Sequence, residues 1–427
     1  MSLAAGISGL AVALLILLGI PIGFALAIGT LAGQVFKGQS SLLLLPLRMF
    51  NGAESFPMVA IPLFILAGQI MNHSGISKRL VDFASALVGF IRGGLAHVSI
   101  VTSMFFAEMS GSAVADAAAL GTVLIPAMSR KGYPRAFAAA VISSAATVAI
   151  IIPPSIPMIL YAVTAEVSVA EMFIGGIIPG ILFGLALMGV SYALALRYRF
   201  PVEQSFRLAE VWRSFRSAAW AFTVPLIILG GILSGVFTAT EASGVAVVAA
   251  LVVGLFIYRE YDLRTLPKTL LDSAIQSAVV MVIVAASAYM GSFLSNEQVP
   301  QRLAQAVLSL STNRWLILGL LNVVFLVAGM VLHSAAAIVM LTPIMMPLVR
   351  AAGIDPVHFG IMMTVNLGIG QQTPPVASVL LTTISIARVT LAEVFRYLPY
   401  FLAAMVVVLL LVTYIPALSL GLVSLVR

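Results

Sequence analysis

The chain has 427 residues, of which 61% are hydrophobic and 9% are charged, and its formal net charge is +7. A soluble core of this size needs more charge, so the composition excludes a soluble globular protein. The sequence contains no cysteine, which excludes disulfides, iron–sulfur clusters and thiolate metal sites. We therefore expect an integral membrane protein.

Uncharged or nearly uncharged stretches recur along the whole chain. They are apolar throughout, without the alternation of barrel strands, so we predict an all-α polytopic membrane protein. At about 20 residues per spanning helix, they predict roughly 11 to 14 membrane-embedded segments. The first stretch is too long for a signal peptide and is interpreted as the first span. The stretches are Leu3–Val35, Ser55–Met71, Ala136–Ala165, Ser217–Thr240, Ala242–Tyr258, Ser273–Asn296, Trp315–Val349, Pro356–Ala387 and Phe401–Val426.

A re-entrant helical hairpin is predicted over about residues 98–126. Its tip lies in SGSAVAD, where Ser110, Gly111 and Ser112 allow close approach of the backbone. Asp116 lies on the returning arm, and an acidic side chain inside a membrane is costly and therefore a functional candidate. The alternative interpretation of the small residues is tight helix packing.

The first double proline, Pro153 and Pro154, interrupts a helix predicted over about residues 136–165. Proline lacks an N–H group, clashes with the preceding turn and pushes the residue before it out of the helical region. In hydrocarbon, such a break survives only if it is buried in protein or lines a polar cavity. Freed carbonyls and the Ser155 hydroxyl can form an oxygen cage for a small cation, and half-helix N-termini can face an anion. The alternative is a simple proline kink.

The densest basic stretch, RYRFPVEQSFRLAEVWRSFR, lies near the middle of the chain. Excess arginine between spans is typical of cytoplasmic loops, so we predict an Arg-rich cytoplasmic linker at residues 201–216. This linker separates a first repeat, residues 1–200, from a second repeat, residues 217–427. The arginines of the stretch are Arg197, Arg199, Arg207, Arg213 and Arg216.

The two halves resemble each other when one is shifted by about 222 residues. A series of matches in the same order predicts two structural repeats, which are typical of secondary transporters. We expect the repeats to be inverted in the membrane, since an odd number of crossings in each half produces that arrangement. Amphipathic stretches at 77–92 and 299–310 are equivalent and are interpreted as interfacial helices. Pro126, Gly132, Pro153 and Pro154 match Pro347, Gly353, Pro374 and Pro375, and Ser112 matches Ser334.

The second repeat contains the same two features as the first. A hairpin is predicted over about residues 318–347, with His333 and Ser334 at its tip. A helix interrupted by Pro374 and Pro375 is predicted over about residues 356–387. Two double prolines at equivalent repeat positions favour a functional role over a pair of kinks. Gln371, Gln372, Thr373 and Ser378 surround the second break.

Four motifs together resemble the large membrane subunit of tripartite ATP-independent periplasmic transporters: SGSAVAD, IPLFILAGQIM, GIDPVHFGIMM and GIGQQTPPVA. The resemblance covers essentially the whole chain. It implies an elevator-type transporter of the bacterial inner membrane, in which a scaffold holds a moving domain with two hairpins and two interrupted helices. It also implies two partners, which are a small four-helix membrane subunit and a periplasmic binding protein that delivers an organic acid.

The resemblance further implies the residues of the sites. A first sodium site would contain Ser110, Gly111, Ser112, Pro153 and Ser155, and a second His333, Ser334, Gly370, Gln372 and Thr373. The substrate would lie between the hairpin tips, near Ser112, Ser155, His333, Ser334, Gln372 and Thr373. The sequence departs from the family pattern at HSAAA, which lacks the usual acidic residue and proline around Ala336, and at Val376-Ala377. His333 is therefore either an anion contact or a backbone-bonded histidine.

The sequence as a whole predicts a sodium-coupled importer of an organic acid anion, with no cofactor other than the coupling ions. The rival prediction is a stand-alone sodium/organic-anion symporter without a binding protein. No HExxH, GxSxG or Walker A motif occurs, so we predict that the chain is not an enzyme or an ATP-driven pump. A channel is disfavoured because interrupted helices in repeats indicate alternating access. The organic acid is left open between a C4-dicarboxylate, a sialic acid, a keto acid and a sulfonate.

Overall fold

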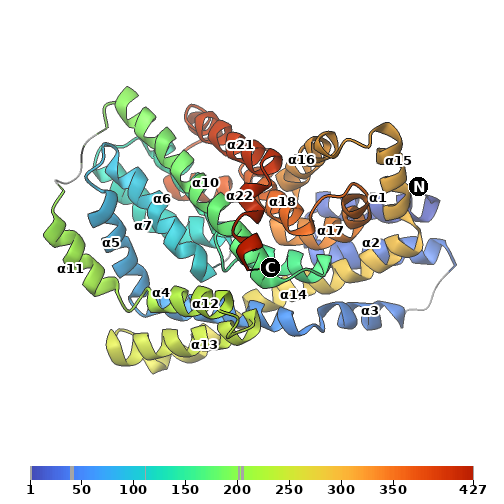
Figure 1. The fold of residues 1–427 in the computed structure, drawn as a ribbon, viewed down its shortest axis with the longest axis horizontal. Helices are drawn as coiled ribbons and strands as arrows, with labels where there is room; N and C mark the ends of the chain where they lie inside the picture. The colour runs from blue at the N-terminus through green and yellow to red at the C-terminus, as the bar shows by residue number, and fades with distance from the viewer. Residues whose placement is uncertain (1, 39–42, 111, 201, 203–205, 427) are drawn as a thin grey trace.

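The computed structural model describes residues 2–426 except 39–42, 111, 201 and 203–205, and only the backbone of residues 107–110. The described residues form helices and connections without a strand, as the sequence predicts (Figure 1). Seven helices are long and apolar enough to cross a membrane, or eight if a bent pair counts as one span. The sequence estimate of 11 to 14 also counted shorter apolar helices of 10–17 residues.

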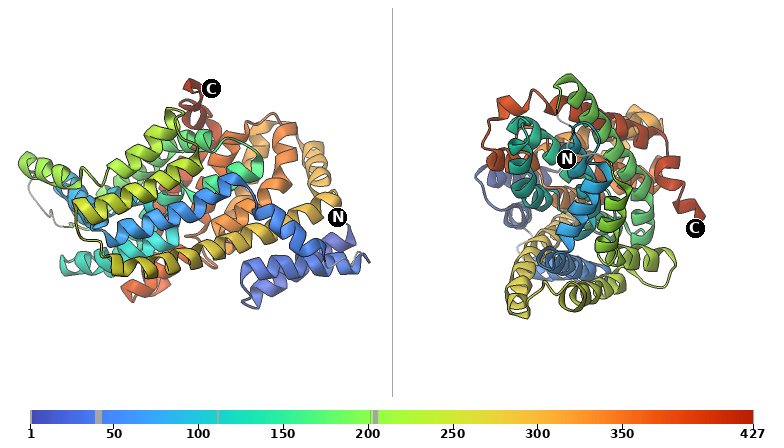
Figure 2. Two further views of the ribbon diagram at one scale, coloured as in Figure 1. Left: turned by 90° about the horizontal axis from the view of Figure 1, so that it is seen from below. Right: turned by 90° about the vertical axis from the view of Figure 1, so that its left-hand side faces the viewer.

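One group of helices forms an outer layer along one edge of the molecule (Figures 1 and 2). Its longest member, α14, packs against α2, α3 and α4, while α1 pairs with α2 and α12 pairs with α13. α13 also packs against α4, which joins the two helix pairs into one layer. The layer consists of α1 (Leu3–Leu17), α2 (Ile22–Phe36), α3 (Leu44–Ala53), α4 (Ala60–His73), α12 (Thr223–Leu233), α13 (Ala239–Val252) and α14 (Leu266–Asn296).

Two interrupted helices form the centre of the molecule. The first is α8 (Arg135–Ala146), which continues as a short 3-10 segment to Ile150 and resumes as α9 (Ile156–Ala165). The second is α18 (Pro356–Gly370), which resumes as α19 (Ser378–Ala387). Residues 136–151 and 357–372 are buried without exception. These helices are apolar all round because protein, and not lipid or water, surrounds them.

Two helical hairpins pack on the interrupted helices. The first is formed by α6 (Gly94–Ser110) and α7 (Ala113–Arg130), and the second by α16 (Arg314–Val331) and α17 (Ser334–Ala351). Each hairpin passes into its interrupted helix through a tight turn with a glycine at positive φ, which is +87° at Gly132 and +64° at Gly353. Glycine suits these positions because a side chain disfavours the left-handed region.

Two shorter helices connect the outer layer with the hairpins, and each is tied by an ion pair to the other half of the chain. At α5 (Ile76–Val88), Arg79 binds Glu260, with the Nη2–Oε1 distance at 2.7 Å. Just before α15 (Val299–Leu310), Glu297 binds Lys37 at the end of α2. The cation belongs to the first half of the chain in both ion pairs. It therefore lies on the connecting helix in one pair, as Arg79, and on the outer layer in the other, as Lys37.

The remaining helices complete the body. α10 (Val169–Arg197) and α21 (Leu398–Tyr414) pack against each other, while α20 (Leu391–Val394) and α22 (Ala417–Leu420) are single turns. The range predicted as a linker contains a helix, α11 (Leu208–Ala218), which packs against α5. Corresponding helices of the two halves begin 220 to 223 residues apart, for example α6 and α16 or α5 and α15. The division into two repeats and the inversion of the repeats stay predictions.

Candidate functional site

The first helix break spans residues 151–155. In an unbroken helix the N–H groups of residues 153 and 154 would bond to the carbonyls of Ala149 and Ile150, and proline removes both donors. The Ser155 hydroxyl donates to the Ile150 carbonyl at 2.8 Å and replaces one of these bonds. Pro153, Pro154 and Ser155 are all buried, and α6, α7, α10 and α18 surround the segment that leads into the break.

The second break spans residues 371–377. Here the prolines remove the helical donors of the Gly370 and Gln371 carbonyls. These carbonyls instead accept from the N–H of Thr373 at 2.9 Å and the N–H of Val379 at 3.2 Å. The Thr373 hydroxyl donates to the Ile369 carbonyl at 3.1 Å. A bonded carbonyl keeps a second lone pair, so this compact turn can still present oxygen ligands.

The second hairpin lies directly on the second break. The backbones of Gly329 and Gly370 approach so closely that a Cβ on Gly370 would lie 2.5 Å from the Gly329 Cα. The N–H of Val376 donates to the Met330 carbonyl at 3.2 Å. The hairpin turn that carries His333 therefore lies beside the break, as the proposed second sodium site requires.

Each hairpin also packs against the interrupted helix of the other half. α7 packs along α19, and the C-terminal parts of both helices line one pocket through Ile125, Ser129 and Ala387. α17 packs along α9, where Arg350 donates to the Ala165 carbonyl at 3.5 Å. In each pair the C-terminal ends lie together. The first hairpin packs against the segment that leads into the first break, and the second hairpin is bonded to the second break, so both hairpins and both breaks lie close together in the interior.

A buried amide joins the two interrupted helices. Gln372 is fully buried, and its Nε2 donates to the Ser143 carbonyl at 2.9 Å and to Thr147 Oγ1 at 3.2 Å. Its Oε1 accepts from the hydroxyls of Ser143 and Ser144, both at 3.2 Å. The side chain predicted to bind sodium or substrate is therefore bonded to α8. Its backbone N–H donates to the Ile369 carbonyl at 3.1 Å, which leaves the Gln372 carbonyl as its oxygen at the second break.

Two other buried polar groups have no protein partner. Ser334 is 1% exposed and Gln371 is 2% exposed, and among the described residues neither the Ser334 hydroxyl nor the Gln371 amide has a hydrogen-bond partner. Ser334 is the first residue of α17, and Gln371 begins the second break. A buried polar group without a partner costs roughly 1–3 kcal/mol, so such groups indicate a ligand-binding position.

The structure places the other predicted residues as follows. Ser112 caps α7 by accepting from the N–H of Ala115 at 3.5 Å. His333 precedes α17 and makes no side-chain capping bond. Ser110 ends α6, but its side chain and the whole of Gly111 lie outside the described residues. The sequence did not single out Ser143, Ser144 and Thr147, although polar side chains in an otherwise apolar run were the available signal.

A small polar pocket of about 40 Å³ lies beside the first hairpin. Asp116 and Phe106 of the hairpin face Gln69 and Asn72 of α4 and Gln276 of α14 across it. Asp116 was a candidate from the sequence, whereas the three amides on the outer layer were missed. Each of them is an amide in a helix of the membrane part, which was a readable signal.

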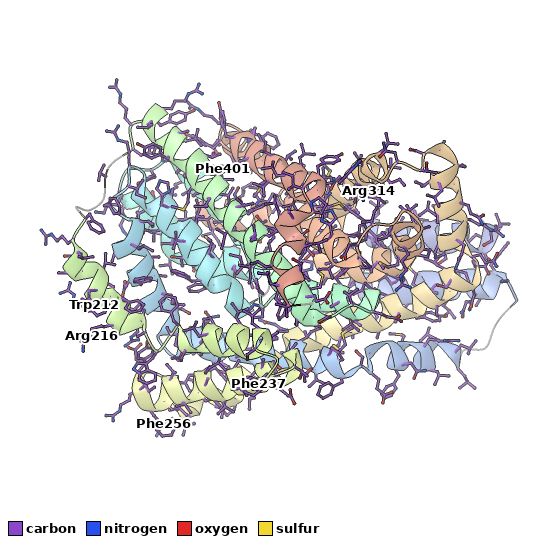
Figure 3. All side chains as sticks on the ribbon, viewed as in Figure 1. Trp212, Arg216, Phe237, Phe256, Arg314 and Phe401 are labelled. Carbon is purple, nitrogen blue, oxygen red and sulfur yellow. The ribbon has the colours of Figure 1, made fainter. Side chains whose placement is uncertain are left out.

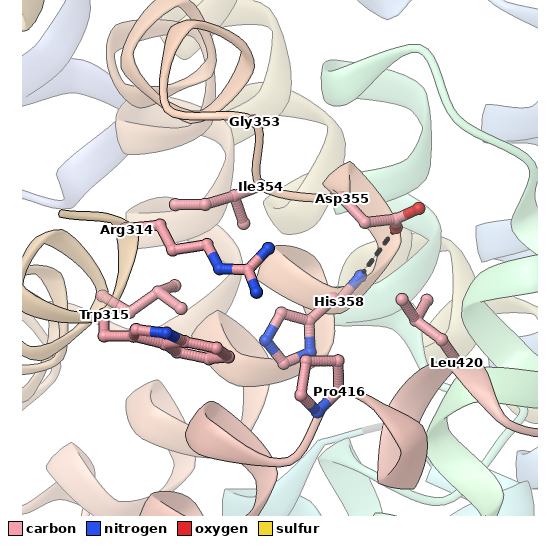
Figure 4. Close-up of a pocket in the computed structure, with 9 residues that line it drawn as sticks. Arg314, Trp315, Gly353, Ile354, Asp355, His358, Pro416 and Leu420 are labelled. Carbon is pink, nitrogen blue, oxygen red and sulfur yellow. Dashed lines mark hydrogen bonds between the residues drawn. The ribbon is translucent and has the colours of Figure 1, made fainter. Parts of the chain in front are cut away.

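A larger pocket of about 140 Å³ lies at the start of α16, where Arg314 and Trp315 face Asp355 and His358 (Figure 4). The ring nitrogens of His358 pair with Ser419 Oγ at 2.7 Å and the Thr413 carbonyl at 3.2 Å, so the imidazole is fully engaged. α16 has 18 residues and leads from this pocket to the second hairpin turn, a distance of about 27 Å. This pocket is therefore separate from the breaks.

The sequence and the fold both match known proteins. The family model described as "Tripartite ATP-independent periplasmic transporter, DctM component" matches residues 10–418. A C4-dicarboxylate TRAP transporter large permease protein of Pseudomonas aeruginosa is 43% identical, over 88% of each chain. An isethionate TRAP transporter permease protein of Oleidesulfovibrio alaskensis is 40% identical, over 95% of this chain and 64% of the relative.

The structure of the Alcanivorax borkumensis YdaH transporter superposes with a TM-score of 0.53 at 14% sequence identity, covering 90% of this chain and 95% of that one. This likeness supports the polytopic helical fold, and the sequence matches define the family. The chain is thus a multi-pass membrane protein that belongs to the DctM family of tripartite ATP-independent periplasmic transporters.

Proposed function

We propose that this subunit imports an organic acid anion across the bacterial inner membrane and couples its movement to sodium entry. The observation that carries the proposal is the packing of two helical hairpins on two interrupted helices whose breaks lie in the buried centre. Unwound backbone at such a place supplies carbonyl oxygens for a small cation, and half-helix N-termini favour an anion.

The first sodium site is proposed at the first hairpin turn and first break, with Ser110, Gly111, Ser112, Pro153 and Ser155. The second is proposed at His333, Ser334, Gly370, Gln372 and Thr373, where Gln372 contributes through its backbone. Support for the second comes from the Val376–Met330 hydrogen bond and the unpartnered Ser334 hydroxyl. The substrate is proposed to lie between the hairpin turns, near Ser112, Ser155, Ser334 and Thr373. The orphan amide of Gln371 joins this set.

An elevator movement is proposed for the central body relative to the outer layer. The two groups are linked by α5 and α15. The ion pair of Arg79 with Glu260 holds the first turn of α5, and the ion pair of Glu297 with Lys37 holds the end of α14 from which α15 starts. Helices held at one end can bend or swing while the central body crosses the bilayer. The family also supports two partners, a small membrane subunit and a periplasmic binding protein that delivers the anion.

The test is uptake of labelled organic acids into proteoliposomes that contain this subunit and its small partner. The panel includes a C4-dicarboxylate and isethionate, because the two relatives above are named for these compounds. An inward sodium gradient is imposed or omitted, and the binding protein is added or left out. Uptake that requires both sodium and binding protein supports the proposal.

Uptake with sodium but without the binding protein would favour a stand-alone symporter. Uptake that ignores sodium would overturn the cation sites at both breaks. Ser155→Ala and Thr373→Val then assign the cations to the two sites, because each substitution removes one hydroxyl from one break.

A further inference from the structure

α11 has a strongly two-sided surface. Leu208, Val211, Trp212 and Phe215 recur at helical spacing and form one face. Arg213 and Ser217 lie on the opposite face together with Glu210, and Arg216 lies at the border between the two faces. This pattern is typical of a helix that lies in a membrane interface, with its apolar face toward acyl chains and its basic face toward headgroups.

The position of α11 fits an interfacial helix. It is bent by 70° from the apolar helix α12 that follows it. Trp212 and Arg216 lie at the outer end of the molecule, away from the packed body (Figure 3). Trp212 is 62% exposed and Leu208 is 71% exposed, which is costly in water but favourable at the edge of a bilayer.

The charge of α11 is not balanced by nearby acids. Arg207 pairs with Glu210 at 3.5 Å, and Glu210 is the only acidic residue of the helix. Within the part of the chain that is described, Arg213 and Arg216 have no carboxylate within 4 Å, and both are exposed. Two free guanidinium groups side by side suit phosphate oxygens, which they bind in a forked geometry.

The helix is anchored to α5 and to the first hairpin by aromatic rings. Phe215 contacts Phe83 of α5 at a ring-centroid distance of 5.7 Å, and Phe83 contacts Phe222 at 5.5 Å. Phe222 also contacts Phe105 of the first hairpin at 5.3 Å. The helix α15, which corresponds to α5, has no such partner helix among the described elements. A surface that binds α11 therefore restrains α5 and not α15.

We propose that α11 is a membrane-surface anchor that binds anionic phospholipid headgroups through Arg213 and Arg216. Its apolar face enters the acyl chains, and its aromatic contacts hold α5 at a fixed depth. The positive-inside prediction places this anchor at the cytoplasmic leaflet. The proposal concerns lipid binding and does not depend on the transported substrate.

The test uses the absence of native cysteine, so that one Ser217→Cys substitution accepts a fluorescent donor on the basic face. The labelled chain is reconstituted into phosphatidylcholine vesicles that contain phosphatidylglycerol. Energy transfer is measured to an acceptor on the headgroup of either lipid. We expect more transfer to phosphatidylglycerol, and we expect Arg213→Gln with Arg216→Gln to reduce this excess roughly tenfold or more.

The matched control removes two exposed cations elsewhere, Arg264→Gln and Lys268→Gln, and should preserve the excess. High salt should reduce the excess in the unsubstituted arginine background, because headgroup attraction is screened. The salt dependence is measured with both arginines present, so it does not depend on whether an arginine variant folds. Equal transfer to both lipids, or an excess that survives the loss of Arg213 and Arg216, would overturn the proposal.

Discussion

The two helix breaks share a double proline but are held in different ways. In the first, the Ser155 hydroxyl bonds back to the Ile150 carbonyl, so the break is closed within its own segment. In the second, Gln372 reaches into α8 and Val376 bonds to the hairpin at Met330. The second break thus holds parts of both halves together. The two breaks therefore differ in what they stabilise. The first is closed by a bond within its own segment, and the second links the two halves of the chain.

The largest effect is expected where the second hairpin meets the second break. Gly370→Val would push side-chain atoms into the Gly329 backbone, which cannot rotate away as a side chain can. We expect destabilisation of about 3 kcal/mol or more and loss of uptake. Thermal unfolding in detergent measures the first effect. Gly244→Val is the control, because nothing lies within 4 Å of a Cβ there. Equal losses in both variants would contradict the close packing.

The next prediction separates Gln372 from its neighbour Gln371. Gln372→Leu removes four hydrogen bonds to the first interrupted helix and leaves the buried Ser144 hydroxyl without its partner, so it should cost about 1–3 kcal/mol of stability. Gln371→Leu removes an amide that has no protein partner, so the unfolding midpoint should not fall. Uptake should fall in both. A Gln371→Leu variant with normal uptake would exclude that amide from the transport site.

A smaller effect is expected for Thr373→Val, which keeps the shape of the side chain but removes its hydroxyl. If the hydroxyl contributes to the second sodium site, the sodium concentration for half-maximal uptake should rise about tenfold, which corresponds to about 1.4 kcal/mol. Thr373→Ser should behave like the wild type. An unchanged sodium dependence in Thr373→Val would remove this hydroxyl from the site.

The smallest effect concerns the ties between the halves. The hydrogen bond from Arg79 holds the pKa of Glu260 below its usual value of 4.5. The pair therefore stabilises the fold above that value, and this contribution disappears as the pH falls through the lowered pKa. Because Glu260 is half exposed, we expect less than about 1 kcal/mol. Glu260→Gln should unfold more easily at neutral pH and match the wild type in acid. If Glu260→Gln still unfolds more easily than the wild type in acid, the cause is lost packing and not the lost ion pair.

The sequence predicted the helical membrane fold and the places where the central helices break. Proline acts through its own covalent structure, so the breaks at 151–155 and 371–377 are readable without knowledge of neighbours. The partner of Gln372 was not readable, because hydrophobic periodicity does not say which helix faces a given side chain. α11 was overlooked because its arginines suggested a linker, although the spacing of Leu208, Trp212 and Phe215 was present in the sequence.

The cross-half contacts have a consequence for biogenesis. The first half cannot complete its interior when it leaves the ribosome. The hydrogen bonds of α8 to Gln372 and the packing of α4 against α13 both need residues of the second half. During synthesis of the residues in between, the Ser144 hydroxyl lacks the Gln372 oxygen to which it donates in the folded chain, while Ser143 and Thr147 can already donate to carbonyls of their own helix. Folding of this chain is therefore a late event that follows insertion, and a ribosome that stalls before residue 372 leaves an unfinished bundle in the bilayer.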